Sequence, residues 1–237
     1  MIALKDRRIL VIGGSSGIGL ATAVAAARAG SMVTIASRSA ERLDAAARII
    51  GPGVVTARLD VTDYESVESY FRQSEAWDHV VVSGSATKSG PARVLDLADA
   101  RAAMDSKFWG AYHVARACNI NHGGSLTLVS GVFSVRPNKE AVLQGAINAA
   151  LESLARGLAL ELAPVRVNVV SPSVTITSLW NKLDDTVRET KFKEAAARFP
   201  AGRVGDPADI ANAILYAAAN PYSTGATILV DGGDALV

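Results

Sequence analysis

The sequence predicts a single α/β domain over residues 1–237, built on a doubly wound, parallel sheet of seven strands with helices on both faces. Three observations predict this fold. The apolar runs are continuous rather than alternating, which indicates strands buried on both sides. Helical segments alternate with these runs along the whole chain. A glycine-rich turn joins the first apolar run to the first helix, as in the strand–helix–strand units of such sheets.

Each element follows from local sequence. Ser39 is placed to cap the second helix, and Pro207 suits the first turn of the last one. No linker, low-complexity tract or short repeat divides the chain, and 237 residues that are 49% hydrophobic suffice for one large core. Residues 173–200 are irregular and then helical. The expected strands are residues 9–12, 32–36, 54–59, 79–82, 125–129, 165–170 and 227–230, and the expected helices are 20–29, 42–50, 64–74, 96–119, 141–162 and 207–218.

Composition and charge exclude several classes of protein. A formal net charge of +1 gives no electrostatic basis for binding nucleic acid or an acidic membrane surface. No apolar run approaches a membrane span, and residues 1–6 lack a signal-peptide pattern. The single cysteine, Cys118, cannot form an internal disulfide, and three scattered histidines give no metal-ligand spacing. We therefore expect a soluble, cytoplasmic protein without a metal site.

The turn at residues 11–19 has the spacing Gly-x3-Gly-x-Gly rather than the commoner Gly-x-Gly-x-x-Gly. Gly13 permits the tight turn, Gly17 lets the backbone approach a phosphate, and Gly19 lets the helix lie close to the sheet. A plain tight turn is the alternative interpretation. Because free N–H groups at a helix start attract anions, the turn predicts a Rossmann-type dinucleotide site. Its predicted pyrophosphate contacts are Gly13, Ser15, Ser16, Gly17, Ile18 and Gly19.

The end of the second expected strand selects the cofactor. An Asp or Glu there binds a free ribose 2′-hydroxyl, but this chain has Ser37-Arg38. A guanidinium pairs with a 2′-phosphate in a fork, and the serine hydroxyl adds a hydrogen bond. The pattern therefore favours NADP(H) over NAD(H), with a solvated surface charge as the alternative interpretation of Arg38.

Over essentially its whole length, the chain resembles the short-chain dehydrogenase/reductase family. The resemblance implies that Asp60 and Val61 flank the adenine of the cofactor. The matching segments are Gly13 to Gly19, Leu59-Asp60-Val61, Gly124-Ser125 to Ser130, Leu158 to Pro164, Arg166 to Pro172 and Val230-Asp231-Gly232-Gly233.

The resemblance also places residues beside the nicotinamide. Ser83, Gly84, Ser85 and Ala86 stand where the family has Asn-Asn-Ala-Gly, so the local hydrogen bonding differs from the family pattern. The segment that holds the carboxamide is matched by Pro172, Val174 and Thr177.

The family's catalytic Asn, Ser, Tyr and Lys are all replaced. The alignment puts Lys107 at the Asn position, Gly131 at the Ser position after Ser130, Gln144 at the Tyr position and Asn148 at the Lys position. Lys107 and Asn148 are the usual Lys and Asn exchanged, as in the ketoreductase domains of polyketide synthases, which resemble this family. The resemblance thus implies that the positive charge near the nicotinamide ribose is kept, with a surface lysine as the alternative.

The tyrosine has no obvious substitute, because the amide of Gln144 donates a hydrogen bond but is not a general acid at neutral pH. Three alternatives follow. Lys107 supplies the proton, its pKa lowered by burial and by the oxidised nicotinamide. Alternatively, an iminium substrate accepts hydride and needs no proton. In the third alternative, the protein binds NADP(H) without reducing anything.

Other residues around the expected pocket have two interpretations each. Ser130 orients a substrate carbonyl if the loop shifts by one residue, or it simply ends a strand. Arg136 anchors a substrate carboxylate or is a solvated loop residue, the latter being favoured. Residues 176–200 correspond to the family's substrate lid, where apolar side chains line the pocket or only pack locally: Leu179, Trp180, Phe192 and Phe199.

Two long helices with small faces resemble the family's dimer-forming pair, so a homodimer or homotetramer is expected. These faces comprise Gly110, Ala111, Ala146, Ala149 and Ala150. The sequence as a whole predicts an NADP(H)-dependent oxidoreductase with an atypical site, acting on a small or medium apolar carbonyl or imine. The alternative is an NADP(H)-binding protein without redox turnover, acting as a sensor, scaffold or non-redox catalyst.

Overall fold

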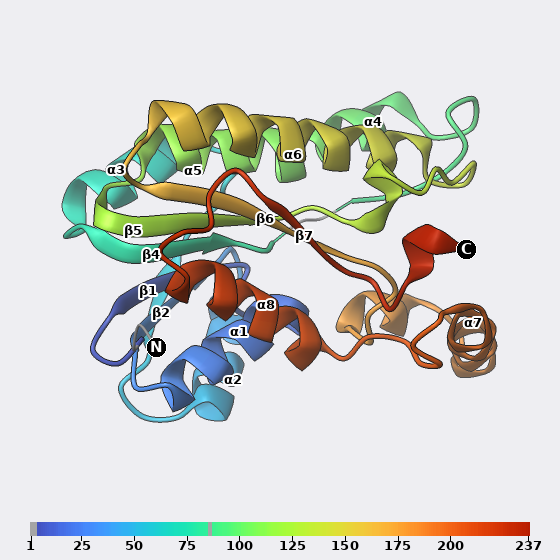
Figure 1. Ribbon diagram of the computed structural model, residues 1–237, viewed down its shortest axis with the longest axis horizontal. Coiled ribbons are helices and arrows are strands. Elements are labelled where there is room, and N and C mark those ends of the chain that lie inside the picture. Colours follow the sequence, from blue (N-terminus) through green and yellow to red (C-terminus); the bar gives the residue numbers. More distant parts are fainter. Residues whose placement is uncertain (1–3, 85–86) are drawn as a thin grey trace.

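The computed structural model describes residues 4–84 and 87–237, and it contains one sheet of seven strands, all parallel (Figure 1). The strand order is β3-β2-β1-β4-β5-β6-β7, so the chain winds outward from β1 in one direction and from β4 in the other. This confirms the predicted fold class. The strands are β1 (Arg8–Ile12), β2 (Met32–Ser37), β3 (Val55–Arg58), β4 (Trp77–Val82), β5 (Ile120–Val129), β6 (Arg166–Pro172) and β7 (Thr227–Val230).

Helices cover both faces of the sheet, and α7 lies at the edge of the molecule near the C-terminus (Figure 1). The α-helices are α1 (Gly17–Arg28), α2 (Ala40–Ile50), α3 (Tyr64–Gln73), α4 (Leu97–Met104), α5 (Gly110–Ala117), α6 (Val142–Glu161), α7 (Asp185–Arg198) and α8 (Pro207–Ala219). Short helical turns also occur at η1 (Asp105–Trp109), η2 (Val132–Ser134), η3 (Ser178–Lys182) and η4 (Asp234–Leu236).

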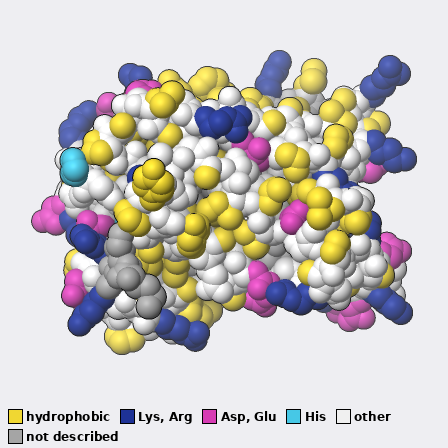
Figure 2. All heavy atoms as spheres, in the orientation of Figure 1, with side chains coloured by type: hydrophobic (Ala, Val, Ile, Leu, Met, Phe, Trp, Pro, Cys, Tyr) yellow, Lys and Arg dark blue, Asp and Glu magenta, His cyan; other side chains and the backbone are white. Residues whose placement is uncertain are grey.

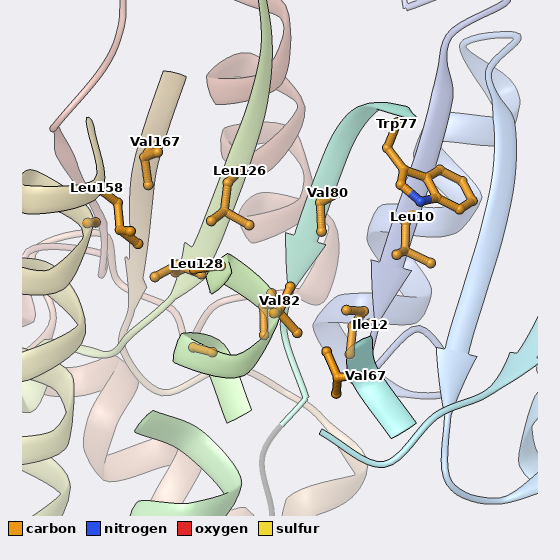
Figure 3. Packing of buried hydrophobic residues seen from close by; sticks show 14 of the residues in the cluster. Leu10, Ile12, Val67, Trp77, Val80, Val82, Leu126, Leu128, Leu158 and Val167 are labelled. Atoms are coloured by element: carbon orange, nitrogen blue, oxygen red, sulfur yellow. The ribbon is translucent and has the colours of Figure 1, made fainter. Parts of the chain in front are cut away.

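Alternate residues of each strand enter two separate cores. Leu10, Val80, Leu126 and Val167 are register partners across four neighbouring strands and point to one face, where α3, α5 and α6 cover them (Figure 3). On the opposite face, Ile9, Val11, Val33, Ile35 and Val81 pack against α1, α2 and α8. Burial on both faces explains why the strands read as continuous apolar runs.

The expected helix over residues 96–119 is wrong in its middle. Residues 105–109 form a π turn between α4 and α5, in which the N–H of Gly110 donates to the carbonyl of Asp105 five residues earlier. The turn inserts one extra residue into an otherwise continuous helix, and hydrophobic periodicity over a long window does not reveal a one-residue insertion. Gly110 allows close packing here, since a Cβ would lie 2.6 Å from Cγ2 of Val61.

Two predicted caps are confirmed. The hydroxyl of Ser39 accepts the N–H of Arg42 at the start of α2. Pro207 occupies the first turn of α8, whose capping box is formed by Asp206 and Asp209. Several strands extend beyond the predicted runs, because β4 begins at Trp77 and β5 begins at Ile120.

The surface carries both signs of charge. On the face in Figure 2, basic and acidic side chains alternate around the rim with scattered hydrophobic ones between them, as the net charge of +1 leads one to expect. Within residues 4–84 and 87–237, no helix is both long and apolar enough to cross a membrane.

His79 is a buried titratable residue at the centre of the sheet. It is 5% exposed, and its Nδ1 lies 2.9 Å from the hydroxyl of Ser125 on the neighbouring strand. Burial, assisted by the charge of Arg166, lowers the pKa of His79 from 6.5 to about 4. The neutral imidazole is therefore the form that the fold accommodates.

We predict that acid weakens the fold through His79. The unfolded chain takes up this proton near pH 6.5 and the folded chain near pH 4, so stability falls as pH drops through that window. The slope contributed is about 1.4 kcal/mol per pH unit. Urea unfolding at several pH values measures it. The pair His79→Val with Ser125→Ala should remove this component, whereas replacing the exposed His122 by Ala should retain it; equal pH dependence in both variants would contradict the assignment.

Candidate functional site

The predicted cofactor-binding segments follow consecutive strands at one edge of the sheet. Residues 13–19 follow β1, Ser37 ends β2 with Arg38 next, and Asp60 and Val61 come soon after β3. Ser83 and Gly84 follow β4, and residues 173–177 follow β6. Because all strands are parallel, these ends meet at a single edge, and the strand order reverses between β1 and β4. A crevice at this position is where open α/β sheets bind ligands.

Three glycines let the backbone close in tightly at this reversal. Gly13 has φ +84°, and a Cβ there would lie 2.3 Å from the backbone nitrogen of Gly84. A Cβ on Gly19 would lie 2.3 Å from the carbonyl of Gly13. Gly17 has φ +53°, and its Cβ would lie 3.3 Å from the side chain of Thr177. Side chains at residues 13 and 19 would therefore collide with nearby backbone. Residue 84 is also glycine because the backbone of Gly13 lies against it.

The first turn of α1 has no side-chain cap. Its N-cap residue, Ser16, is extended and makes no capping hydrogen bond. By contrast, side chains cap the starts of α2, α3, α4, α7 and α8. The N–H groups at the start of α1 are thus available to an anionic group, together with the partial positive charge of the helix end.

The remaining predicted cofactor residues surround this turn. Arg38 is exposed and makes no ion pair or hydrogen bond within the described part of the chain. The carboxylate of Asp60 accepts both the N–H and the hydroxyl of Thr62, at 3.0 and 2.8 Å. Pro172 ends β6 and Val174 follows it. The predicted contact at Ser85 lies outside the described residues.

Lys107, Asn148 and Ser130 meet in one network. The Nζ of Lys107 donates to Oδ1 of Asn148 at 2.7 Å and to the backbone carbonyl of Ser130 at 2.8 Å. The π turn carries Lys107 into this position, while α6 carries Asn148 and the end of β5 carries Ser130. The exchanged pair identified in the sequence is therefore in direct contact, and Lys107 is not a surface lysine.

The environment of Lys107 favours its neutral form more than water does. Burial lowers the pKa of Lys107 to about 8, against the opposing attraction of the Glu152 carboxylate. Two of the three ammonium hydrogens are accepted by Asn148 and Ser130, so one remains for another partner. A lysine with this pKa exchanges protons readily near neutral pH.

The face of α6 that lies against this network is polar although buried. Gln144, Asn148 and Glu152 are spaced four residues apart on α6 and are 8%, 3% and 8% exposed. The Gln144 side chain makes no hydrogen bond to another described residue. Gly131 lies beside this face, and a Cβ there would be 2.9 Å from Nδ2 of Asn148. The present position of Asn148 therefore leaves no room for a serine at residue 131.

Glu152 was missed by the sequence interpretation. Its Oε1 accepts the hydroxyls of Ser130 at 3.0 Å and Ser134 at 2.6 Å. The hydroxyl of Ser130 is thus engaged inside the protein, and its carbonyl holds Lys107. The available signal was an acidic residue eight positions after Gln144 on a helix face that is otherwise apolar or amide-bearing.

The predicted lid residues divide into two groups. Trp180 and Phe192 pack edge-to-face at 5.3 Å, and the indole N–H of Trp180 donates to the carbonyl of Thr175. Phe199 is buried, at 4% exposed, whereas Leu179 is 63% exposed. Local packing therefore accounts for three of the four residues, and Leu179 is the one presented to solvent.

Comparison with known proteins identifies the family. Residues 13–234 match the family described as enoyl-(acyl carrier protein) reductase. A short-chain dehydrogenase/reductase of Stachybotrys chlorohalonatus is 29% identical over 98% of both chains. The chain belongs to the short-chain dehydrogenase/reductase family. The galactitol 2-dehydrogenase of Cereibacter sphaeroides, which forms L-tagatose, is 33% identical over 94% of this chain and 92% of that enzyme.

Two solved short-chain dehydrogenase/reductase structures are also similar. A small-chain dehydrogenase in complex with NADPH is 34% identical, with a TM-score of 0.82 over 98% of this chain and 100% of that one. A short-chain oxidoreductase from Pseudomonas aeruginosa PAO1 is 26% identical, with a TM-score of 0.86 over 96% of each chain. The latter is described as NADPH-bound and as containing an atypical catalytic centre.

In this short-chain dehydrogenase/reductase, the side chain of Arg136 is 25% exposed and takes part in an ion-pair network at the C-terminal turn. Its Nε lies 3.1 Å from a carboxylate oxygen of Asp234, and the same oxygen accepts from Arg198 at 2.9 Å. Asp234 is 1% exposed and also contacts the hydroxyl of Ser173. The C-terminal turn therefore ties together the loop after β5, the segment after β6 and the end of α7.

No group of three or more His, Cys, Asp or Glu side chains with the geometry of a metal site occurs in residues 4–84 and 87–237.

We predict that Asp234→Asn lowers the free energy of unfolding by roughly 2–4 kcal/mol, because two arginines then share a site without their carboxylate. Partial exposure of both arginines places the expected loss below that of a fully buried pair. Urea denaturation measures the loss. Asp185→Asn is the matched control, since Asp185 pairs with Arg188 at the surface. A loss no larger than that of the control would refute the role of Asp234.

Proposed function

We propose that this protein is an NADP(H)-dependent oxidoreductase that transfers hydride between the nicotinamide and a small or medium carbonyl or imine. The observation that carries the proposal is the contact of Lys107 with Asn148 and the Ser130 carbonyl. That contact restores a positively charged proton donor to a site in which the family's tyrosine and lysine positions are occupied by Gln144 and Asn148.

The residues present fit a dinucleotide. The turn at Gly13 to Gly19 is a backbone cradle that a Cβ would fill, and the uncapped start of α1 supplies free N–H groups for a pyrophosphate. The exposed, unpaired guanidinium of Arg38 and the hydroxyl of Ser37 suit a 2′-phosphate. Asp60 and Val61 would flank the adenine; Ser83, Gly84, Ser85, Pro172, Val174 and Thr177 would surround the nicotinamide half. The NADPH complexes of two similar structures support this choice.

When bound, the reduced nicotinamide supplies the hydride. Lys107 supplies the proton, because its third N–H is not accepted by Asn148 or Ser130 and its pKa lies at about 8. Gln144 orients the substrate oxygen or nitrogen through its free amide N–H. Asn148 and Ser130 act by holding the ammonium in place. The exposed Leu179 of the expected lid suits a substrate with little charge.

An iminium ion, the protonated form of an imine, needs less from the site than a ketone does. Hydride addition to a ketone produces an alkoxide, which must be protonated as it forms. Hydride addition to an iminium produces a neutral amine, so no proton is transferred. No tyrosine hydroxyl contacts Lys107 or Asn148 within the described residues. The chemistry with the least demand on Lys107 is therefore reduction of a cyclic imine that enters the site already protonated, as an iminium ion.

The second candidate function is NADP(H) binding without redox turnover, as a sensor, scaffold or non-redox catalyst. Among the described residues no tyrosine hydroxyl bonds to Lys107, and this favours the second candidate, since an amide at residue 144 does not act as a general acid. The retained lysine charge favours the oxidoreductase instead, because a binding protein has no need for a lysine of lowered pKa beside the cofactor crevice.

We also propose a cytoplasmic homodimer or homotetramer. Ala146 and Ala149 are exposed on α6 and permit the close approach of a second copy. Gly110 and Ala111 are buried within the protomer, whereas Trp109 at the end of η1 and Tyr112 of α5 are exposed. Exposed aromatic side chains of this kind are enriched at protein interfaces.

Arg38→Asp should reverse the cofactor preference. We expect the dissociation constant for NADPH to rise by about 10- to 100-fold, from loss of a charge-assisted hydrogen-bonded pair, and that for NADH to fall. Titration of intrinsic fluorescence with each cofactor measures both constants. Arg48→Asp, at an exposed position on α2, is the control for net charge. Tighter binding of NADH than of NADPH by the unmodified protein would refute the assignment of NADP(H) as the cofactor.

Lys107→Met should slow ketone reduction by about 10²–10⁴-fold, because a general acid is lost, while NADPH binding is retained. Reduction of cyclic iminium compounds should fall much less. In the unmodified protein, ketone reduction should decline as pH rises through about 8, since the neutral amine does not donate the proton. NADPH oxidation against ketones and cyclic imines measures these rates, with Lys139→Met as control. Tight NADPH binding without turnover of any substrate would favour the second candidate.

A further inference from the structure

Glu152 is a buried carboxylate that the proposed proton transfer does not use. It is 8% exposed and lies on α6, four residues after Asn148 and eight after Gln144. Residues at this spacing share one face of a helix, so the acidic group belongs to the same surface as the proposed site. A buried charge is costly unless polar groups or an opposite charge compensate it.

The contacts of Glu152 lead directly to Lys107. Oε1 of Glu152 accepts the hydroxyl of Ser130 at 3.0 Å, and the carbonyl of the same serine accepts the Lys107 ammonium at 2.8 Å. A second hydroxyl, from Ser134, reaches the same oxygen at 2.6 Å. Ser130 thus links the two charged groups: its hydroxyl donates to the Glu152 carboxylate and its carbonyl accepts from the Lys107 ammonium.

Few other charges act on Lys107. On α6, Gln144 and Asn148 are neutral amides. Asp105 of the π turn is exposed, and His113 of α5 points its Nδ1 at the carbonyl of Val61, 2.8 Å away. Within the described part of the chain, Glu152 is the group whose charge attracts the Lys107 ammonium.

We propose that Glu152 is a positioning residue for Lys107: its carboxylate anchors Ser130 by the hydroxyl and keeps the Lys107 side chain charged as an ammonium. This inference rests on the proposed function, in which Lys107 donates the proton. Without Glu152, burial alone would act on the lysine, and a larger share of the protein would hold a neutral amine that has no proton to give.

The geometry offers a clean variant. Both serine hydroxyls donate to the same oxygen, so the amide oxygen of Glu152→Gln accepts them as before and only the charge is lost. We expect the midpoint of Lys107 ionisation to move down by roughly one pH unit, the scale of a nearby opposite charge. The fall in ketone reduction at high pH should move down by the same amount. Mass-spectrometric measurement of Lys107 acetylation by acetic anhydride across pH reports the ionisation without any turnover.

Three further variants separate charge from structure. Glu152→Asp and Ser134→Ala keep the carboxylate and should retain the unmodified midpoint, and Glu161→Gln removes an exposed carboxylate of the same helix without effect. A lowered thermal stability of Glu152→Gln with an unchanged midpoint would overturn the proposal. If Glu152→Gln does not fold, labelling of the unmodified protein decides: a midpoint well below 8, with Lys107 already neutral at pH 7, would overturn the proposal equally. Absence of turnover in the unmodified protein refutes only the proposed function, because the labelling comparison still decides whether Glu152 holds the charge.

Discussion

Parallel pairing of all seven strands is the constraint on which the rest of this structure depends. It places the carboxyl ends of the strands on one edge, so segments far apart in the sequence become neighbours. The reversal of strand order between β1 and β4 then opens the edge at one place, where Gly13 meets Gly84. Neither glycine has a special role in isolation. Their close approach exists because the two strands are adjacent and run in the same direction.

Three charged side chains inside this fold each have polar partners. Lys107 has the Ser130 carbonyl and Asn148, Glu152 has two serine hydroxyls, and Asp234 has two arginines. The desolvation cost of each charge is offset by these partners, since buried ionic groups are tolerated only when their hydrogen-bonding capacity is used. The three sets lie near the ends of β5 and β6 and at the C-terminal turn.

The fold could be predicted from the sequence because its signals are local and repeated. Runs such as Val80-Val81-Val82 indicate a strand covered on both faces, and Ser39 and Pro207 indicate where helices start. The contact between Lys107 and Asn148 was also within reach, because the family pattern places both residues. The position of Glu152 on the same face of α6 was a usable signal, but its serine partners and those of Asp234 were not predictable, since they lie on other elements and their spacing in the chain carries no information about the contact. The pairing of Arg136 with Asp234 was out of reach for the same reason.

The π turn at residues 105–109 illustrates a further consequence. An α-helix turns by about 100° per residue, so inserting or deleting one residue rotates every later side chain of the same helix about the helix axis. Here the π turn accommodates the extra residue, so α5 after it still buries Val114 and Ala115 in the core. The direction of the lysine is thereby uncoupled from the register of the helix that carries it. Such a turn lets one side chain face the site while the helix beyond it keeps its packing against the sheet.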